Sequence, residues 1–199
     1  MVVNGIEYLD EDTELYDDGS VRDATLARDA IVQGLPCAGD RAVVFYPGGR
    51  LRLAWLVRAA DVGSLRCGAG IVYLHPNGSV LNAAMAGEQR LGEVVVPAGE
   101  RVTLDDAGRL LEYSRSLNSD GWVGGLACAA AFRVWLYAGG RPSVVVLASA
   151  STVAGVTYPR GTELFLDEGG GVLRRYTADV DSGEQYKQRV FGVLEAAFA

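Results

Sequence analysis

Histidine is nearly absent from this sequence, and basic residues are few. The chain of 199 residues has one histidine, His75, and 18 lysines and arginines against 25 aspartates and glutamates, for a net charge of −7. A protein that binds a nucleic-acid backbone or an anionic membrane surface needs a basic face. The charge balance therefore argues against nucleic-acid and membrane partners.

Long apolar runs are missing as well. No apolar stretch approaches the roughly 20 residues of a membrane-spanning helix, and residues 1–18 are acidic, unlike the basic and then apolar start of a signal peptide. We therefore expect a cytoplasmic protein. Three cysteines cannot all pair with one another, so we expect reduced thiols.

Familiar motifs of catalytic and metal sites are lacking too. A histidine-based metal site or a triad would depend wholly on His75, and there is no Gly-x-Ser-x-Gly, His-Glu-x-x-His or phosphate-loop motif. The cysteines form no Cys-x-x-Cys pair of the zinc-site type. The acidic residues 10–18 lack the glycine and the ligand spacing of an EF-hand loop. We expect no metal and no cofactor.

Glycine, by contrast, is plentiful and periodic. Glycines with a turn-forming neighbour recur about every thirty residues, which is the signature of a repeat architecture. These turn glycines are Gly19, Gly49, Gly78, Gly108, Gly140 and Gly170. Apolar residues alternate with others before and after each of them, which predicts a strand on either side of the turn. A repeat this short cannot bury its own apolar face, so neighbouring repeats must stack.

A third short segment follows each turn at a fixed distance. The position eighteen residues after the turn glycine is Cys37, Cys67, Val96 or Tyr158, and Cys128 falls there once two extra residues in the fourth repeat are allowed for. Because valine and tyrosine replace cysteine in this column, we interpret the three cysteines as small buried core residues and not as metal ligands.

These patterns predict one all-β domain over residues 1–199. Six repeats over about 13–175 would form either a β-solenoid or an open stacked β-sheet, and the pattern does not separate parallel coils from antiparallel hairpins. Beyond Arg175 the repeat ends. Ser182 and Gln185 fit a capping box, which predicts an α-helix over about 183–198 that caps the stack.

The segments 45–49 and 135–140 each combine aromatic residues with a turn glycine. With the column pattern over 13–173, they make the chain resemble bacterial tandem β-repeat proteins, of which the MORN-type repeats are the best known. The repeat here is longer than the MORN repeat and lacks its Tyr-x-Gly opening. The resemblance implies a scaffold or an interaction surface, by analogy of fold.

The column three residues before each turn glycine is mixed polar and aromatic. It consists of Tyr16, Tyr46, His75, Asp105, Tyr137 and Asp167. One interpretation is a groove in which His75, Asp105 and Asp167 transfer protons while the tyrosines stack on a ligand. The other is that these are ordinary strand-end residues beside turns.

The column five residues before each turn glycine is unusually apolar for a strand face directed away from the core. It consists of Glu14, Val44, Tyr73, Thr103, Trp135 and Phe165. We therefore expect the middle of the chain to bury both faces of its sheet. The terminal helix, a second subunit or an apolar small molecule would cover this face.

Two functions follow from these patterns. The first is a non-enzymatic repeat scaffold or interaction module that binds a protein partner, or forms a homodimer, through an aromatic face around Tyr46, Tyr73, Trp135 and Tyr137. The second is a small-molecule enzyme or binder without a cofactor, with an apolar pocket and Tyr, Asp or His75 for acid–base chemistry. An enclosed cavity lined by these residues would favour the second.

Overall fold

The computed structural model describes residues 1–9, 11 and 13–177, so the predicted helix over 183–198 lies outside the described residues. The chain divides into two compact parts, Met1–Tyr113 and Ser114–Ala199, which we call the N-terminal and C-terminal bodies. That residues 1–199 form a single domain stays a prediction. The described residues confirm the all-β class, with twenty-four strands that alternate between long and short hairpins.

The long hairpins carry the turn glycines that define the repeat. Their strands are β3 (Glu14–Leu15), β4 (Val21–Thr25), β7 (Ala42–Phe45), β8 (Leu51–Leu56), β11 (Gly70–Leu74), β12 (Val80–Ala84), β15 (Arg101–Leu104), β16 (Leu110–Arg115), β19 (Val134–Tyr137), β20 (Pro142–Val146), β23 (Thr162–Leu166) and β24 (Val172–Thr177). Each turn glycine has a positive φ angle, +87° at Gly78, which glycine adopts without steric cost.

A short hairpin precedes each long one, where the sequence suggested only a single short segment. The strands are β1 (Val2–Val3), β2 (Ile6–Glu7), β5 (Ala30–Val32), β6 (Leu35–Cys37), β9 (Ala60–Val62), β10 (Leu65–Cys67), β13 (Gln89–Leu91), β14 (Val94–Val96), β17 (Gly121–Val123), β18 (Leu126–Cys128), β21 (Ser151–Val153) and β22 (Val156–Tyr158). Gln33 and Gly34 both have positive φ, which is the type I′ geometry of two-residue hairpin turns. Each repeat therefore contains four strands, and the first repeat begins at β1.

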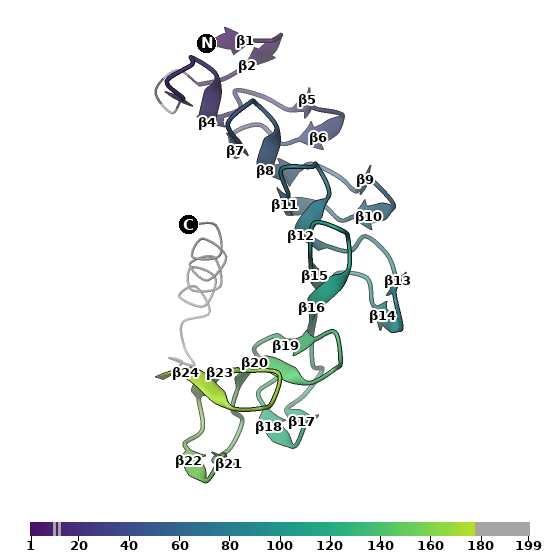
Figure 1. The fold of residues 1–199 in the computed structure, drawn as a ribbon, viewed down its shortest axis with the longest axis vertical. Helices are drawn as coiled ribbons and strands as arrows, with labels where there is room; N and C mark the ends of the chain where they lie inside the picture. The colour runs from purple at the N-terminus through teal and green to yellow at the C-terminus, as the bar shows by residue number, and fades with distance from the viewer. Residues whose placement is uncertain (10, 12, 178–199) are drawn as a thin grey trace. The chain divides into compact units, whose positions relative to one another are not determined.

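The long hairpins lie side by side and form an open sheet in each body (Figure 1). The strand order is β3-β4-β7-β8-β11-β12-β15-β16 in the N-terminal body and β19-β20-β23-β24 in the C-terminal body. Every pairing assigned among the described strands of these two sheets is antiparallel. The sequence did not separate parallel coils from antiparallel hairpins, and the structure has antiparallel hairpins.

The core of the N-terminal body lies between its sheet and its short hairpins, which Figure 1 shows on one side of the sheet. The predicted cysteine column is confirmed there and in the C-terminal body. Cys37, Cys67 and Cys128 are free thiols with no exposed surface. Each ends a short hairpin and pairs with a residue at the end of a long hairpin: Leu56 in β8, Met85 directly after β12 and Leu147 directly after β20. The column therefore joins each short hairpin to its long one.

Candidate functional site

The polar column three residues before the turn glycines hydrogen-bonds one repeat to the next. In the N-terminal body the Tyr16 hydroxyl donates to the Phe45 carbonyl at 2.8 Å, and the Tyr46 hydroxyl donates to the Leu74 carbonyl at 2.9 Å. In the C-terminal body the Tyr137 hydroxyl donates to the Leu166 carbonyl at 2.7 Å. We call this series the inter-repeat ladder.

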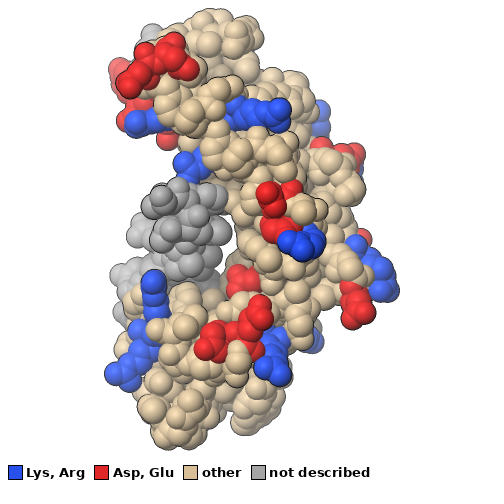
Figure 2. Space-filling model, in the orientation of Figure 1, with Lys and Arg blue, Asp and Glu red and all other residues tan. Residues whose placement is uncertain are grey.

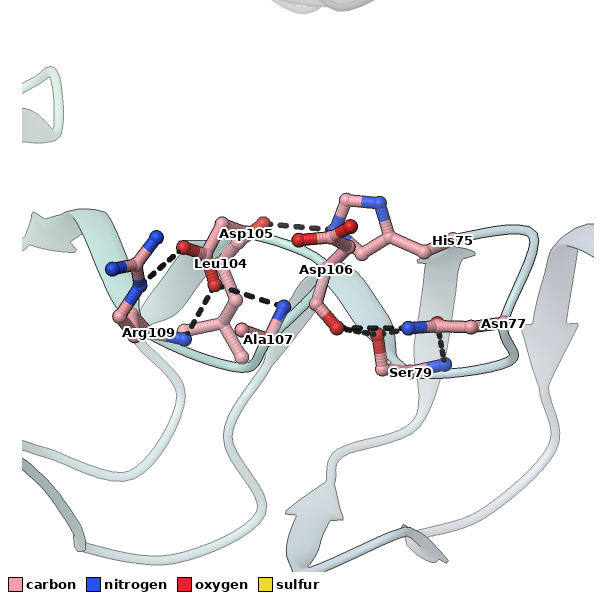
Figure 3. A network of polar contacts seen from close by, with 8 residues as sticks. All are labelled: His75, Asn77, Ser79, Leu104, Asp105, Asp106, Ala107 and Arg109. Carbon is pink, nitrogen blue, oxygen red and sulfur yellow. Dashed lines mark hydrogen bonds and ion pairs between the residues drawn. The ribbon is translucent and has the colours of Figure 1, made fainter.

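His75 takes the same place in the ladder as the tyrosines. Its Nε2 lies 3.0 Å from the carbonyl oxygen of Leu104 in the next repeat (Figure 3). Because a carbonyl only accepts, Nε2 carries the proton of this bond. The acceptor is always the residue four before the next turn glycine, so His75 replaces a tyrosine hydroxyl without changing the geometry.

The two aspartates of the column bind their own turns. Asp105 Oδ1 accepts hydrogen bonds from the backbone N–H groups of Arg109 at 2.8 Å and Ala107 at 3.1 Å, and its Oδ2 accepts from Arg109 Nε at 2.6 Å (Figure 3). The hydrogen bonds from Arg109 lower the pKa of the Asp105 carboxyl. Asp167 Oδ1 accepts from the Gly171 N–H at 2.8 Å. Both carboxylates therefore serve as turn caps.

The turns themselves are also linked along each body. An Arg50 guanidinium nitrogen lies 3.2 Å from the Asn77 carbonyl of the next turn, and the Asn77 amide donates to the Asp106 carbonyl at 2.8 Å. Arg141 makes the equivalent bond to the Glu168 carbonyl at 3.0 Å. Most of the polar candidates proposed from the sequence thus lie in a region where side chains satisfy backbone groups.

We predict that Tyr46→Phe destabilises the N-terminal body by about 1 kcal/mol, because it leaves the Leu74 carbonyl without its ladder donor. Urea unfolding measured in parallel with Tyr113→Phe, which removes a tyrosine hydroxyl outside the ladder, checks this. Equal midpoints for the two variants would show that the ladder adds nothing to stability.

The four residues predicted to form an aromatic binding face do not form one exposed strip. Tyr46 and Tyr137 are half-buried members of the ladder. Tyr73 and Trp135 are buried, with 9% and 7% of their surface exposed. The expectation that the middle of the chain buries both faces of the sheet is therefore confirmed at these two residues, while the part of all four in binding stays a prediction.

A polar cluster lies beside Tyr73 on the same sheet face. Asn82 pairs with Tyr73 across the sheet, is 1% exposed, and donates through its amide to Thr103 Oγ1 at 2.9 Å. Arg101 Nε donates to Asn82 Oδ1 at 2.9 Å, and its guanidinium also lies 3.2 Å from the Ile71 carbonyl. These contacts fix Asn82 and Arg101 within the sheet.

Sequence reasoning missed the outer side of the short hairpins. In five of the short hairpins the first strand has an exposed or half-exposed middle residue, and the middle pair differs from repeat to repeat. The pairs are Ile31 and Pro36, Asp61 and Arg66, Arg90 and Val95, Trp122 and Ala127, and Thr152 and Thr157. Trp122 is 74% exposed and Ile31 is 60% exposed. The available signal in the sequence was a repeat position whose residue type varies, flanked by repeat positions that stay apolar.

These outer pairs occupy the same geometry but have different chemistry. Arg66 makes two hydrogen bonds to the Asp61 carboxylate, at 3.0 and 3.1 Å, and the Thr152 and Thr157 hydroxyls lie 2.9 Å apart. Trp122 and its partner Ala127 place one large exposed ring at this position. The fold does not require any particular residue here, so this column is where the repeats differ in surface chemistry.

A small depression of about 180 Å³ lies beside the second repeat. It is lined by Asp29, Ala30, Ile31, Pro36, Cys37, Val57 and Arg58. None of His75, Asp105 and Asp167 lines it. Within the described part of the chain, no grouping of histidine, cysteine and acidic side chains has the arrangement of a metal site. Nor do the described residues include a helix with the length and apolarity to cross a membrane.

Comparisons of the chain with protein-family models, curated proteins and solved structures found no match. The resemblance to MORN-type repeats therefore stays a prediction.

Proposed function

We propose that the protein is a non-enzymatic repeat scaffold that binds another protein through an exposed face of its short hairpins. The face consists of the exposed residues Trp122, Thr152 and Thr157 in the C-terminal body, and we call it the Trp122 face. The observation that carries the proposal is that Trp122 is 74% exposed, at a position where the fold requires no aromatic residue.

The division between constant and variable columns supports this function. In repeat proteins the constant positions build the stack and the variable surface positions bind partners. Here the turn glycines and the buried cysteine column keep one role from repeat to repeat. Tryptophan is over-represented among residues that dominate binding at protein interfaces, because it buries a large area with little loss of rotamer freedom. An exposed tryptophan in the variable column is thus a suitable anchor.

The alternative of a small-molecule enzyme or binder has less support. Its proton-transfer candidates, His75, Asp105 and Asp167, each have a backbone partner. The depression beside Ile31, of about 180 Å³, is lined by none of these three residues. These observations favour the scaffold.

The experiment compares Trp122→Ala with Thr152→Ala, a neighbour on the same face. A protein recovered with the wild-type chain from source cells is purified, and its affinity is measured by calorimetry for the wild type and both variants. We expect Trp122→Ala to weaken binding by about 2 kcal/mol and Thr152→Ala by much less. Unchanged affinity for Trp122→Ala contradicts the proposed face, and a small molecule retained in native mass spectrometry would favour the alternative.

A further inference from the structure

Neighbouring long hairpins pair in one constant register. The residue four after a turn glycine lies opposite the residue five before the next turn glycine. This holds for Asp23 and Val44, Leu53 and Tyr73, and Asn82 and Thr103 in the N-terminal body, and for Val144 and Phe165 in the C-terminal body. The pairing between repeats is therefore predictable from the distance to the turn glycine alone.

Strand β3 ends the strand order of the N-terminal body and strand β24 ends that of the C-terminal body, and each pairs on one side only among the described strands. The residue four after Gly170 is Arg174, on β24, and the residue five before Gly19 is Glu14, on β3. Both side chains are exposed. If β24 of one copy met β3 of another in the constant register, Arg174 would lie opposite Glu14.

The first repeat exposes an apolar residue whose equivalents in the other repeats are buried. Leu15 is 47% exposed, whereas its equivalents in the other five repeats are buried. Those residues are Phe45, Leu74, Leu104, Leu136 and Leu166, with 1–6% exposure. Within each body the preceding repeat bonds the carbonyl of this column, at Phe45, Leu74, Leu104 and Leu166.

The two ends also carry opposite charge. Glu11, Glu14, Asp17 and Asp18 are exposed around β3, and Figure 2 shows acidic side chains gathered at this end of the N-terminal body. Strand β24 contains Arg174 and Arg175, both exposed, and no acidic residue. Like charges directly opposite each other destabilise a strand pair, whereas opposite charges stabilise it.

We propose that copies of this chain associate end to end, with β24 of one copy paired antiparallel to β3 of the next. The pairing continues the repeat register, so Arg174 of one copy forms an ion pair with Glu14 of the other. This interface is heterologous, because two different strands meet. Pairing of β24 with a second β24 is disfavoured, since it would bring four arginines together. The proposal does not depend on the Trp122 face.

The strand pairing and the charges must hold this interface without a ladder bond. Asp167 occupies the ladder position of the last repeat and accepts from Gly171. A carboxylate cannot donate to the Leu15 carbonyl of a following copy. Glu14 is already close to Arg22 of its own hairpin, and its side chain remains 60% exposed, so it is accessible to a second arginine.

The test is the molecular mass of the full chain in low salt, measured by sedimentation over a range of concentrations. We expect the wild type to associate, and Arg174→Glu and Glu14→Arg each to associate about tenfold more weakly. A mixture of the two variants restores association, because the glutamate introduced on β24 of one variant then meets the arginine introduced on β3 of the other. Arg160→Glu, an exposed arginine of the same repeat outside β24, serves as the matched control and is expected to behave as wild type.

Three results would each overturn the proposal. The first is a wild type that stays monomeric up to millimolar concentration. The second is that both variants associate as strongly as the wild type. The third is that a mixture of the two variants associates no more strongly than either variant alone. An effect of Arg174→Glu without one of Glu14→Arg would instead indicate a symmetric contact between two β24 strands. Loss of the Trp122 face leaves all these measurements unchanged, so the two proposals fail separately.

Discussion

Replacing Trp135 with alanine is expected to destabilise the protein by roughly 3–5 kcal/mol, the usual cost of deleting a large buried aromatic side chain. Trp135 is 7% exposed and lies opposite Val144 in the sheet of the C-terminal body. Its removal leaves a cavity, because the pairing of β19 with β20 holds the backbone in place. Urea unfolding followed by circular dichroism measures the loss.

Trp122→Ala is the matched control, since it deletes the same side chain at an exposed position. It is expected to change stability by no more than about 0.5 kcal/mol. Comparing Trp135→Ala with Trp122→Ala also shows whether the aromatic face around Trp135 or the Trp122 face is the binding surface. If Trp135→Ala leaves stability unchanged but weakens association, Trp135 belongs to an interface, and the aromatic face predicted from the sequence is correct.

A second large effect is expected at high pH. Burial raises the pKa of Cys37, Cys67 and Cys128 from 9.0 to about 11 each. The folded state therefore favours the neutral thiols, and their contribution to stability is full below pH 9. It is lost as the pH rises through 11, because the unfolded chain releases these protons first. The loss corresponds to roughly 2–3 kcal/mol per thiol.

The control for this titration is a triple variant with valine at all three positions. Val96 already occupies the column in the fourth repeat and has no exposed surface, so valine fits the site. Unfolding free energies measured between pH 8 and 11.5 should fall less steeply for the triple variant than for the wild type. Burial also raises the pKa of Tyr8 and Tyr46, and that part of the slope remains in both proteins. Identical slopes would mean that the thiols ionise freely in the folded state.

The inter-repeat ladder explains why the column three residues before the turn glycines suggested proton-transfer chemistry. Tyrosine, histidine and aspartate are the residues of proton transfer, but they are also side chains that reach a neighbouring carbonyl or cap a turn. At Tyr46 and His75 the partner is a backbone oxygen in the next repeat, 28 or 29 residues away in sequence. No local pattern reveals such a partner, because the constant register of the sheet creates it.

The sequence by itself determined the repeat and its core. The glycine spacing, the alternation around it and the cysteine column predicted stacked β-strands with buried thiols, because positions that recur once per repeat must form continuous columns when repeats stack. The tertiary structure decided the rest. Alternation has the same period in parallel and antiparallel strands, so only the pairing showed antiparallel hairpins. Trp122 and Trp135 both lie on strands, and only the packed fold exposes one ring and buries the other.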